Sequence, residues 1–187
     1  VLMRSQWEQK WSEEAARVIQ QSQFHDFRWK SWWCVENYFG MENPQTIEPS
    51  GLETKVEGHI NGQKVLGFID RWQANENNSV VISDYKTGKV PAPRFRGDKF
   101  FQLLVYSYLI NQMFPEYEVE TLELLYIKGG VRLTEKVTSE ARDEMVETVT
   151  SVSTGIQSRC ESGEFEPKVS RLCDWCGYKS FCPAWQK

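Results

Sequence analysis

Two apolar runs joined by an Asn-rich turn constrain the fold of this chain more than any other feature. Residues 64–72 and 79–86 are rich in β-branched and aromatic side chains and bounded by turn residues, so they predict two β-strands. Residues 74–78 form the turn between them, and the pair Asn61 and Gly62 ahead of the first run is a strong hairpin signal. The sequence therefore predicts successive antiparallel strands.

Charged side chains stand near the ends of these strands. Asp70 lies near the end of the first, and Asp84 and Lys86 end the second. Because alternate strand residues share a face, Asp84 and Lys86 point to one side, and the hairpin can bring Asp70 alongside. Two carboxylates and a backbone carbonyl suffice for Mg²⁺ or Mn²⁺, and a lysine can hold or deprotonate the attacking water or neutralise a phosphate. The set predicts phosphodiester cleavage; the alternative is an ordinary polar strand end.

Two further polar features lie beyond this set. Gln102 and Tyr106 are four residues apart in an expected helix and share a face, where they can bind phosphate or water or simply edge a packing face. Although the net charge is −4, a basic strip follows the second strand and can bind DNA phosphates, the alternative being a solvated loop. The strip comprises Lys86, Lys89, Arg94, Arg96 and Lys99.

The order of the expected elements predicts an α/β fold with a mixed β-sheet flanked by helices. Helices are expected over residues 2–21, 28–39, 98–113 and 139–161, strands over 53–83, and a hairpin of residues 118–127 and 131–137. Met145, Val149, Val152 and Ile156 recur at helical spacing and predict a core stripe. We expect three regions: an N-terminal helical segment (1–50), a core (51–162) and a cysteine-rich tail (163–187). No long uncharged apolar run or signal peptide is visible, so we expect a cytoplasmic protein without a membrane partner.

Three of the five cysteines cluster near the C-terminus. Cys173, Cys176 and Cys182 have spacing typical of metal ligation, and either an iron–sulfur cluster or Zn²⁺ fits. We expect their sulfurs to converge on one point and to act as a structural staple. The candidates for a fourth ligand are Cys34, Cys160, His25 and His59, with Cys160 more typical of a buried thiol and Cys34 equally consistent with a small core residue.

Four segments together resemble the PD-(D/E)XK nucleases, within a restriction-endonuclease-like core. They are Gly67-Phe-Ile-Asp70-Arg, Val81-Ile-Ser-Asp84-Tyr-Lys-Thr-Gly-Lys89, Gln102-Leu-Leu-Val-Tyr106 and the cysteine tail. The most similar branch is the RecB-type exonuclease domain with a 4Fe-4S cluster, which AddB-type and CRISPR-associated RecB-like nucleases share. The resemblance covers residues 52–185, including Gly163-Glu-Phe-Glu-Pro167. It implies a Mg²⁺- or Mn²⁺-dependent DNA exonuclease of recombination or repair, working with a helicase or recombination partner.

The resemblance also implies roles for individual residues. Asp70, Asp84 and the Tyr85 carbonyl would bind the metal, with Glu57 as a further acidic residue, and Lys86 would be the catalytic lysine. Gln102 and Tyr106 would orient DNA or water. The branch usually has a histidine ligand on an N-terminal helix and an upstream Cys-Pro-x-x-Phe segment, and neither is present. We therefore expect that the chain lacks an N-terminal portion. A catalytically silent, cluster-bearing DNA-binding module and a zinc-stabilised interaction domain are the alternatives.

Overall fold

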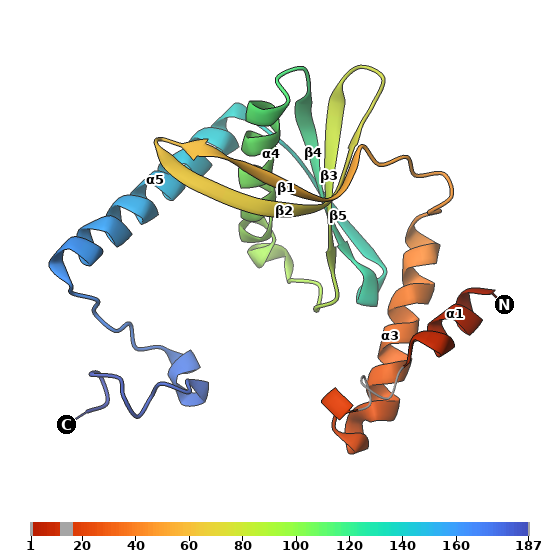
Figure 1. Ribbon diagram of the computed structural model, residues 1–187, viewed down its shortest axis with the longest axis horizontal. Coiled ribbons are helices and arrows are strands. Elements are labelled where there is room, and N and C mark those ends of the chain that lie inside the picture. Colours follow the sequence, from red (N-terminus) through yellow and green to blue (C-terminus); the bar gives the residue numbers. More distant parts are fainter. Residues whose placement is uncertain (1, 12–16, 187) are drawn as a thin grey trace. The chain divides into compact units, whose positions relative to one another are not determined.

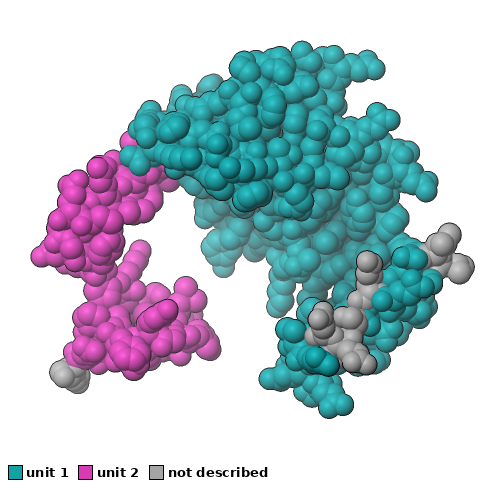
Figure 2. All heavy atoms as spheres, viewed as in Figure 1, with its two compact units in different colours: residues 1–146 teal, residues 147–187 magenta. Residues whose placement is uncertain are grey.

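The computed structural model describes residues 2–11 and 17–186, which fall into two compact units (Figure 2). The first unit, Val1–Val146, contains the sheet, and the second, Glu147–Lys187, contains most of the last helix and the cysteine tail. The helices are α1 (Leu2–Lys10), α3 (Gln21–Met41), α4 (Phe101–Met113) and α5 (Ser139–Ser162). The strands are β1 (Gly51–Ile60), β2 (Gln63–Ala74), β3 (Ser79–Lys86), β4 (Glu118–Tyr126) and β5 (Val131–Lys136).

The five strands form one mixed sheet in sequence order (Figure 1). β1, β2 and β3 pair antiparallel, β3 and β4 pair parallel, and β4 and β5 pair antiparallel. A parallel pair requires a crossover connection, and α4 provides it between β3 and β4. The mixed sheet flanked by helices confirms the predicted fold class.

The core of the first unit lies between α4 and the sheet. Helix α4 packs against β1, β3 and β4 and buries an apolar face, and β4 buries successive leucines. The fully buried side chains include Leu103, Leu109, Ile110, Leu122, Leu124 and Leu125. This packing holds the C-terminal end of β3 against a rigid support, which matters because that end carries Asp84 and Lys86.

The ladder between β1 and β2 is irregular at Glu53 and Asp70. Leu52 pairs with Arg71 and Thr54 with Ile69, whereas Glu53 and Asp70 between them do not pair. Glu53 adopts a φ of 46°, in the left-handed region that residues other than glycine rarely occupy. The register of the two strands is the same on both sides of this interruption, and Asp70 lies directly across the ladder from Glu53.

The N-terminal helices differ from the prediction in extent. Helix α1 ends at Lys10, so the predicted helix over residues 2–21 is too long, and residues 12–16 of it lie outside the described residues. Helix α3 spans residues 21–41 rather than 28–39. Trp7 of α1 packs against Trp32 of α3, with ring centroids 5.2 Å apart.

The predicted core stripe of α5 begins in the first unit and continues in the second, and only its first member, Met145, is buried. Val152 and Ile156 are 57% and 52% exposed, and Cys160, expected to be buried, is exposed as well. From Glu147 onward the helix belongs to the second unit, in which no described side chain is buried. Helical periodicity identified an apolar face, but the described residues of that unit do not cover it. No described helix is long and apolar enough to cross a membrane.

Candidate active site

The two predicted aspartates lie where β2 and β3 separate. The ladder between these strands ends at the pair Arg71 and Ser83, and Asp70 and Asp84 are the next residues on the two strands. Beyond this pair, Asp70 Oδ2 accepts a hydrogen bond of 2.8 Å from the backbone N–H of Tyr85. An aspartate side chain therefore takes the place of the next inter-strand bond at the fork of the sheet. Asp70 lies near enough to Asp84 for its charge to act on that carboxyl.

Asp84 is buried beside a single ammonium group. Its side chain is 10% exposed, and Lys86 Nζ lies 2.6 Å from Asp84 Oδ2, as expected for strand residues on one face. Burial raises the pKa of the Asp84 carboxyl; Lys86 opposes this effect, and the nearby charge of Asp70 adds to it. Burial therefore makes the ionised form of Asp84 less stable than it would be in water, and a bound cation would offset this loss of hydration.

These carboxylates fit a hard divalent cation. The buried Oδ2 of Asp84 contacts Lys86 Nζ at 2.6 Å, and an ionised carboxylate offers about four acceptor positions on its two oxygens, so Asp84 can also bind a cation. No group of three His, Cys, Asp or Glu side chains within residues 2–11 and 17–186 could hold a metal ion. The protein would thus supply two carboxylates, Asp70 and Asp84, with backbone oxygen and water completing the shell, as is common for Mg²⁺.

The structure does not bring Glu57 to this point. Glu57 is exposed on β1, pairs with Leu66 in the ladder, and forms ion pairs with Lys55 at 3.0 Å and Lys64 at 3.9 Å. The acidic residue of β1 level with Asp70 is Glu53, which our sequence analysis did not select. Glu53 lies level with Asp70 because the hairpin at Asn61 and Gly62 pairs Ile60 with Gln63, and the same register continues along both strands. The hairpin signal in the sequence could therefore have identified Glu53.

The polar pair of α4 is assembled as its spacing predicted. Gln102 Nε2 donates a hydrogen bond of 2.7 Å to Tyr106 Oη, and Tyr106 is buried. The Tyr106 ring lies directly on the backbone of Gly67, where any added Cβ would overlap it. Gly67 is three residues before Asp70, so this contact ties α4 to the strand that carries the aspartate.

We expect Gly67→Ala to lower thermal stability and, if this site is catalytic, DNA cleavage as well. The added methyl group would displace the Tyr106 ring, and overpacking of this kind costs about 1–3 kcal/mol. Gly88→Ala is the matched control, because nothing lies within 4 Å of a Cβ at that position. Thermal denaturation of the two variants measures the effect. Equal melting temperatures would show that α4 moves freely away from β2.

The predicted basic strip lies on the loop between β3 and α4, which includes the short 3₁₀ helices η1 (Pro93–Phe95) and η2 (Gly97–Lys99). Lys89, Arg94 and Lys99 are exposed there. Arg96 is half-buried and donates to the Pro91 carbonyl at 3.4 Å, so it supports the loop conformation. The strip therefore presents three exposed cations immediately after Lys86.

The described residues do not bring the C-terminal cysteines together into a metal-binding group. Cys173, Cys176 and Cys182 are free thiols and form no metal-binding group within the described chain. Cys173 lies in the short helix η4 (Arg171–Trp175), where its sulfur accepts a hydrogen bond from the Ser170 N–H at 3.3 Å. A local capping contact thus orients this sulfur.

Among the residues that the structure describes, none of the four candidates for the remaining ligand position is part of a metal-binding group either. His25 Nε2 accepts a hydrogen bond of 2.8 Å from the indole N–H of Trp29, and burial raises the pKa of the Cys34 thiol. His59 and Cys160 are exposed.

Comparison with known proteins identifies a family, and two solved structures are among those similar to this chain. The model of the PD-(D/E)XK nuclease superfamily matches residues 2–183. A candidate exonuclease from Eubacterium rectale is 19% identical with a TM-score of 0.46; the match covers 67% of this chain and 50% of that protein, so the chain spans half its length. The protein in the crystal structure of SSO0001 is 18% identical to this chain, with a TM-score of 0.47. The match covers 99% of this chain and 82% of that protein. No curated protein matches the chain.

Proposed function

The chain belongs to the PD-(D/E)XK nuclease superfamily, and we propose that it is a Mg²⁺- or Mn²⁺-dependent deoxyribonuclease acting as an exonuclease. The observation that carries this proposal is the fork of β2 and β3, where Asp70 and Asp84 are the next residues after the last pair of the ladder and Lys86 lies 2.6 Å from the buried Asp84 carboxylate. Because fold alone does not establish function, the proposal depends on this site and not on the architecture.

Each group of the site has a separate proposed role. Asp70, Asp84 and the Tyr85 carbonyl would hold the cation, which when bound would polarise the phosphate and make water more acidic. Lys86 would hold or deprotonate the attacking water, or neutralise the phosphate charge, from a position beside Asp84. Gln102, bonded to Tyr106, would orient DNA or water from α4.

The exposed cations after β3 support DNA as the substrate. Lys89, Arg94 and Lys99 could neutralise phosphates next to the site although the whole chain is acidic. Arg94 also places its guanidinium 4.7 Å from the centre of the Phe95 ring, a half-exposed aromatic surface on which a base could stack.

End-labelled linear DNA and covalently closed circular DNA, each incubated with Mg²⁺, with Mn²⁺ and with EDTA, test the proposal. An exonuclease degrades the linear substrate only, and only with the cation. Cutting of closed circles would replace the exonuclease assignment with an endonuclease. Absence of cleavage in all samples would overturn the proposed activity and favour a silent DNA-binding module.

We also propose, from the motif resemblance, a RecB-type role in recombination or repair together with a helicase or recombination partner. The support is the set of segments around Asp70, Asp84 and Gln102 and the cysteine spacing. Co-purification of the natural protein with a DNA-dependent ATPase would support this assignment, and purification as an isolated nuclease would count against it.

An iron–sulfur cluster at the C-terminal cysteines stays a prediction, supported by their spacing alone. Anaerobic reconstitution with iron and sulfide is expected to give a brown protein with visible absorbance, whereas Zn²⁺ would leave it colourless. Cys176→Ser should then lose the colour and become more sensitive to proteolysis after Leu172. Cys160→Ser tests one of the candidates for the fourth ligand, and a variant that keeps the colour would exclude the exposed Cys160 from that position. A colourless protein that also retains no zinc would exclude both metals.

A further inference from the structure

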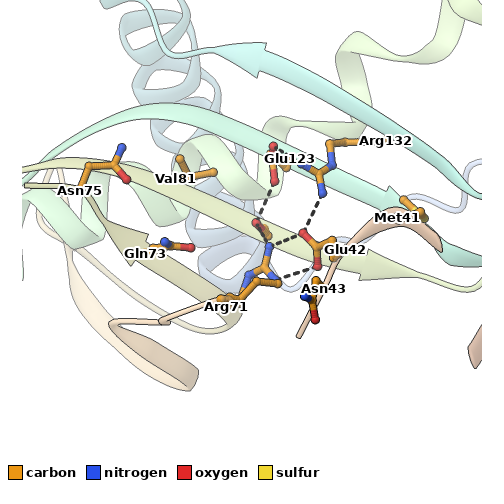
Figure 3. A pocket seen from close by; sticks show the side chains of 11 residues that line it. Met41, Glu42, Asn43, Arg71, Gln73, Asn75, Val81, Glu123 and Arg132 are labelled. Carbon is orange, nitrogen blue, oxygen red and sulfur yellow. Dashed lines mark hydrogen bonds and ion pairs between the residues drawn. The ribbon is translucent and has the colours of Figure 1, made fainter. Parts of the chain in front are cut away.

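A network of charged and polar side chains lines a pocket on the sheet (Figure 3). We call it the Glu42 network, and its members are Glu42, Arg71, Ser83, Glu123 and Arg132. They come from the residue after α3 and from β2, β3, β4 and β5 in turn, so the network connects α3 to four strands. It borders a cavity of about 330 Å³ that is also lined by Asn43, Gln73 and Asn75. Because alternate strand residues point to opposite faces, Ser83 of this network and the next residue, Asp84, point to opposite sides of the sheet.

The contacts are short and continuous. Glu42 accepts two hydrogen bonds of 2.8 Å from the two terminal nitrogens of Arg71, a bidentate pair. Arg132 donates to the same carboxylate at 2.8 Å and pairs with Glu123 at 3.3 Å. Bidentate pairs of this kind fix the orientation of both groups as well as their distance.

Net stability is a poor explanation for this arrangement. The side chains of Arg71 and Glu42 are only 7% and 6% exposed, so both charges have lost most of their hydration. Buried ion pairs often contribute no more stability than apolar side chains of similar size, because desolvation offsets the attraction. What such pairs can provide is a unique geometry.

The Glu42 network can fix the geometry of the fork, where β2 and β3 separate. Arg71 directly follows Asp70, and Ser83 directly precedes Asp84. Arg71 Nη2 donates a hydrogen bond of 3.0 Å to Ser83 Oγ, and Ser83 in turn donates to Glu123 at 3.2 Å. This bond joins the last pair of the ladder, so it sets how far apart the strands are at the point where the aspartates emerge on the opposite face.

We propose that the Glu42 network positions Asp70 and Asp84 for cation binding, with Glu42, Arg71 and Ser83 as positioning residues. Glu42 acts on the site through Arg71 and Ser83, and in this way it links the segment after α3 to the two aspartates. This inference rests on the proposed function only in that the two aspartates bind the cation.

Mn²⁺ titration calorimetry of the whole chain without DNA tests the inference. In a double variant, Glu42→Leu and Arg71→Met replace the buried ion pair by apolar side chains of similar size. The ion pair between Arg132 and Glu123 stays in place. We expect a melting temperature close to that of the parent and at least tenfold weaker Mn²⁺ binding. Ser83→Ala removes the central hydroxyl alone and is expected to weaken binding severalfold.

The control is Met145→Ala, a core truncation outside the network. It should lower the melting temperature and leave Mn²⁺ affinity unchanged, which separates positioning from general loss of stability. Parent-like Mn²⁺ affinity in Ser83→Ala and the double variant would overturn the inference. If the double variant does not fold, Ser83→Ala decides alone.

The same titration separates the two proposals. A parent protein that binds Mn²⁺ but does not cut DNA would remove the proposed activity and leave the positioning inference to be judged from the affinities. A parent protein that binds no Mn²⁺ would overturn both.

Discussion

Asp84→Asn is expected to lower cation-dependent DNA cleavage by about 10³-fold, because a catalytic cation supplies several kcal/mol of charge stabilisation and Asn cannot replace a carboxylate ligand. Asn keeps the shape of the side chain in its buried site, so the loss would not reflect a cavity. The measurement is the initial rate on end-labelled linear DNA at saturating Mn²⁺. Cleavage at the parent rate would show that the centre lies elsewhere.

The same substitution is expected to raise the stability of the cation-free protein near neutral pH. Burial raises the pKa of Asp84 above the ordinary value of 3.8, so the folded state binds this proton more tightly than the unfolded state. The stability due to the protonated form is complete below the unfolded pKa and is lost as pH rises through the folded pKa. Asn carries no charge at any pH and avoids this loss.

Melting temperatures of the parent and Asp84→Asn in EDTA, at about pH 7 and about pH 4, test whether the substitution stabilises the cation-free protein. Asp84→Asn should melt above the parent at the higher pH, and the difference should shrink at the lower pH. Loss of the Lys86 partner costs little, because that ammonium is 35% exposed. A variant that melts below the parent at neutral pH would show that the ion pair with Lys86 outweighs the burial of Asp84.

Lys86→Ala is expected to lower cleavage by about 10²–10³-fold, the loss typical of one electrostatic group in an active site. Mn²⁺ binding should be as tight as in the parent or tighter, because the substitution removes the positively charged Lys86 ammonium, which lies 2.6 Å from the Asp84 carboxylate. The cation-free variant should melt lower at neutral pH, since Asp84 is then buried without its partner, and Mn²⁺ should restore the melting temperature.

Lys89→Ala is the matched control for Lys86, three residues further along and fully on the exposed loop. We expect only a small decrease in cleavage that disappears at low salt, because an exposed phosphate contact is screened by ions. Equal losses in the two variants would mean that Lys86 binds DNA rather than acting in the chemical step.

Local patterns in the sequence determined much of this protein. Alternation along residues 79–86 placed Asp84 and Lys86 on one face, and turn residues placed the strands. Helical spacing paired Gln102 with Tyr106. These features depend on neighbours within a few positions, so the sequence predicts them without knowledge of the rest of the fold. The resemblance of the motifs to PD-(D/E)XK nucleases agrees with the family match.

Only the tertiary structure decided the features that join distant segments. Glu42 meets Arg71 across 29 positions, and Gly67 receives the Tyr106 ring, because the sheet and α4 bring them together. The left-handed Glu53 and the exposed Val152 likewise contradict local expectation. Pairing of charges and coverage of an apolar face depend on which elements pack against each other, and residue periodicity carries no information about that choice.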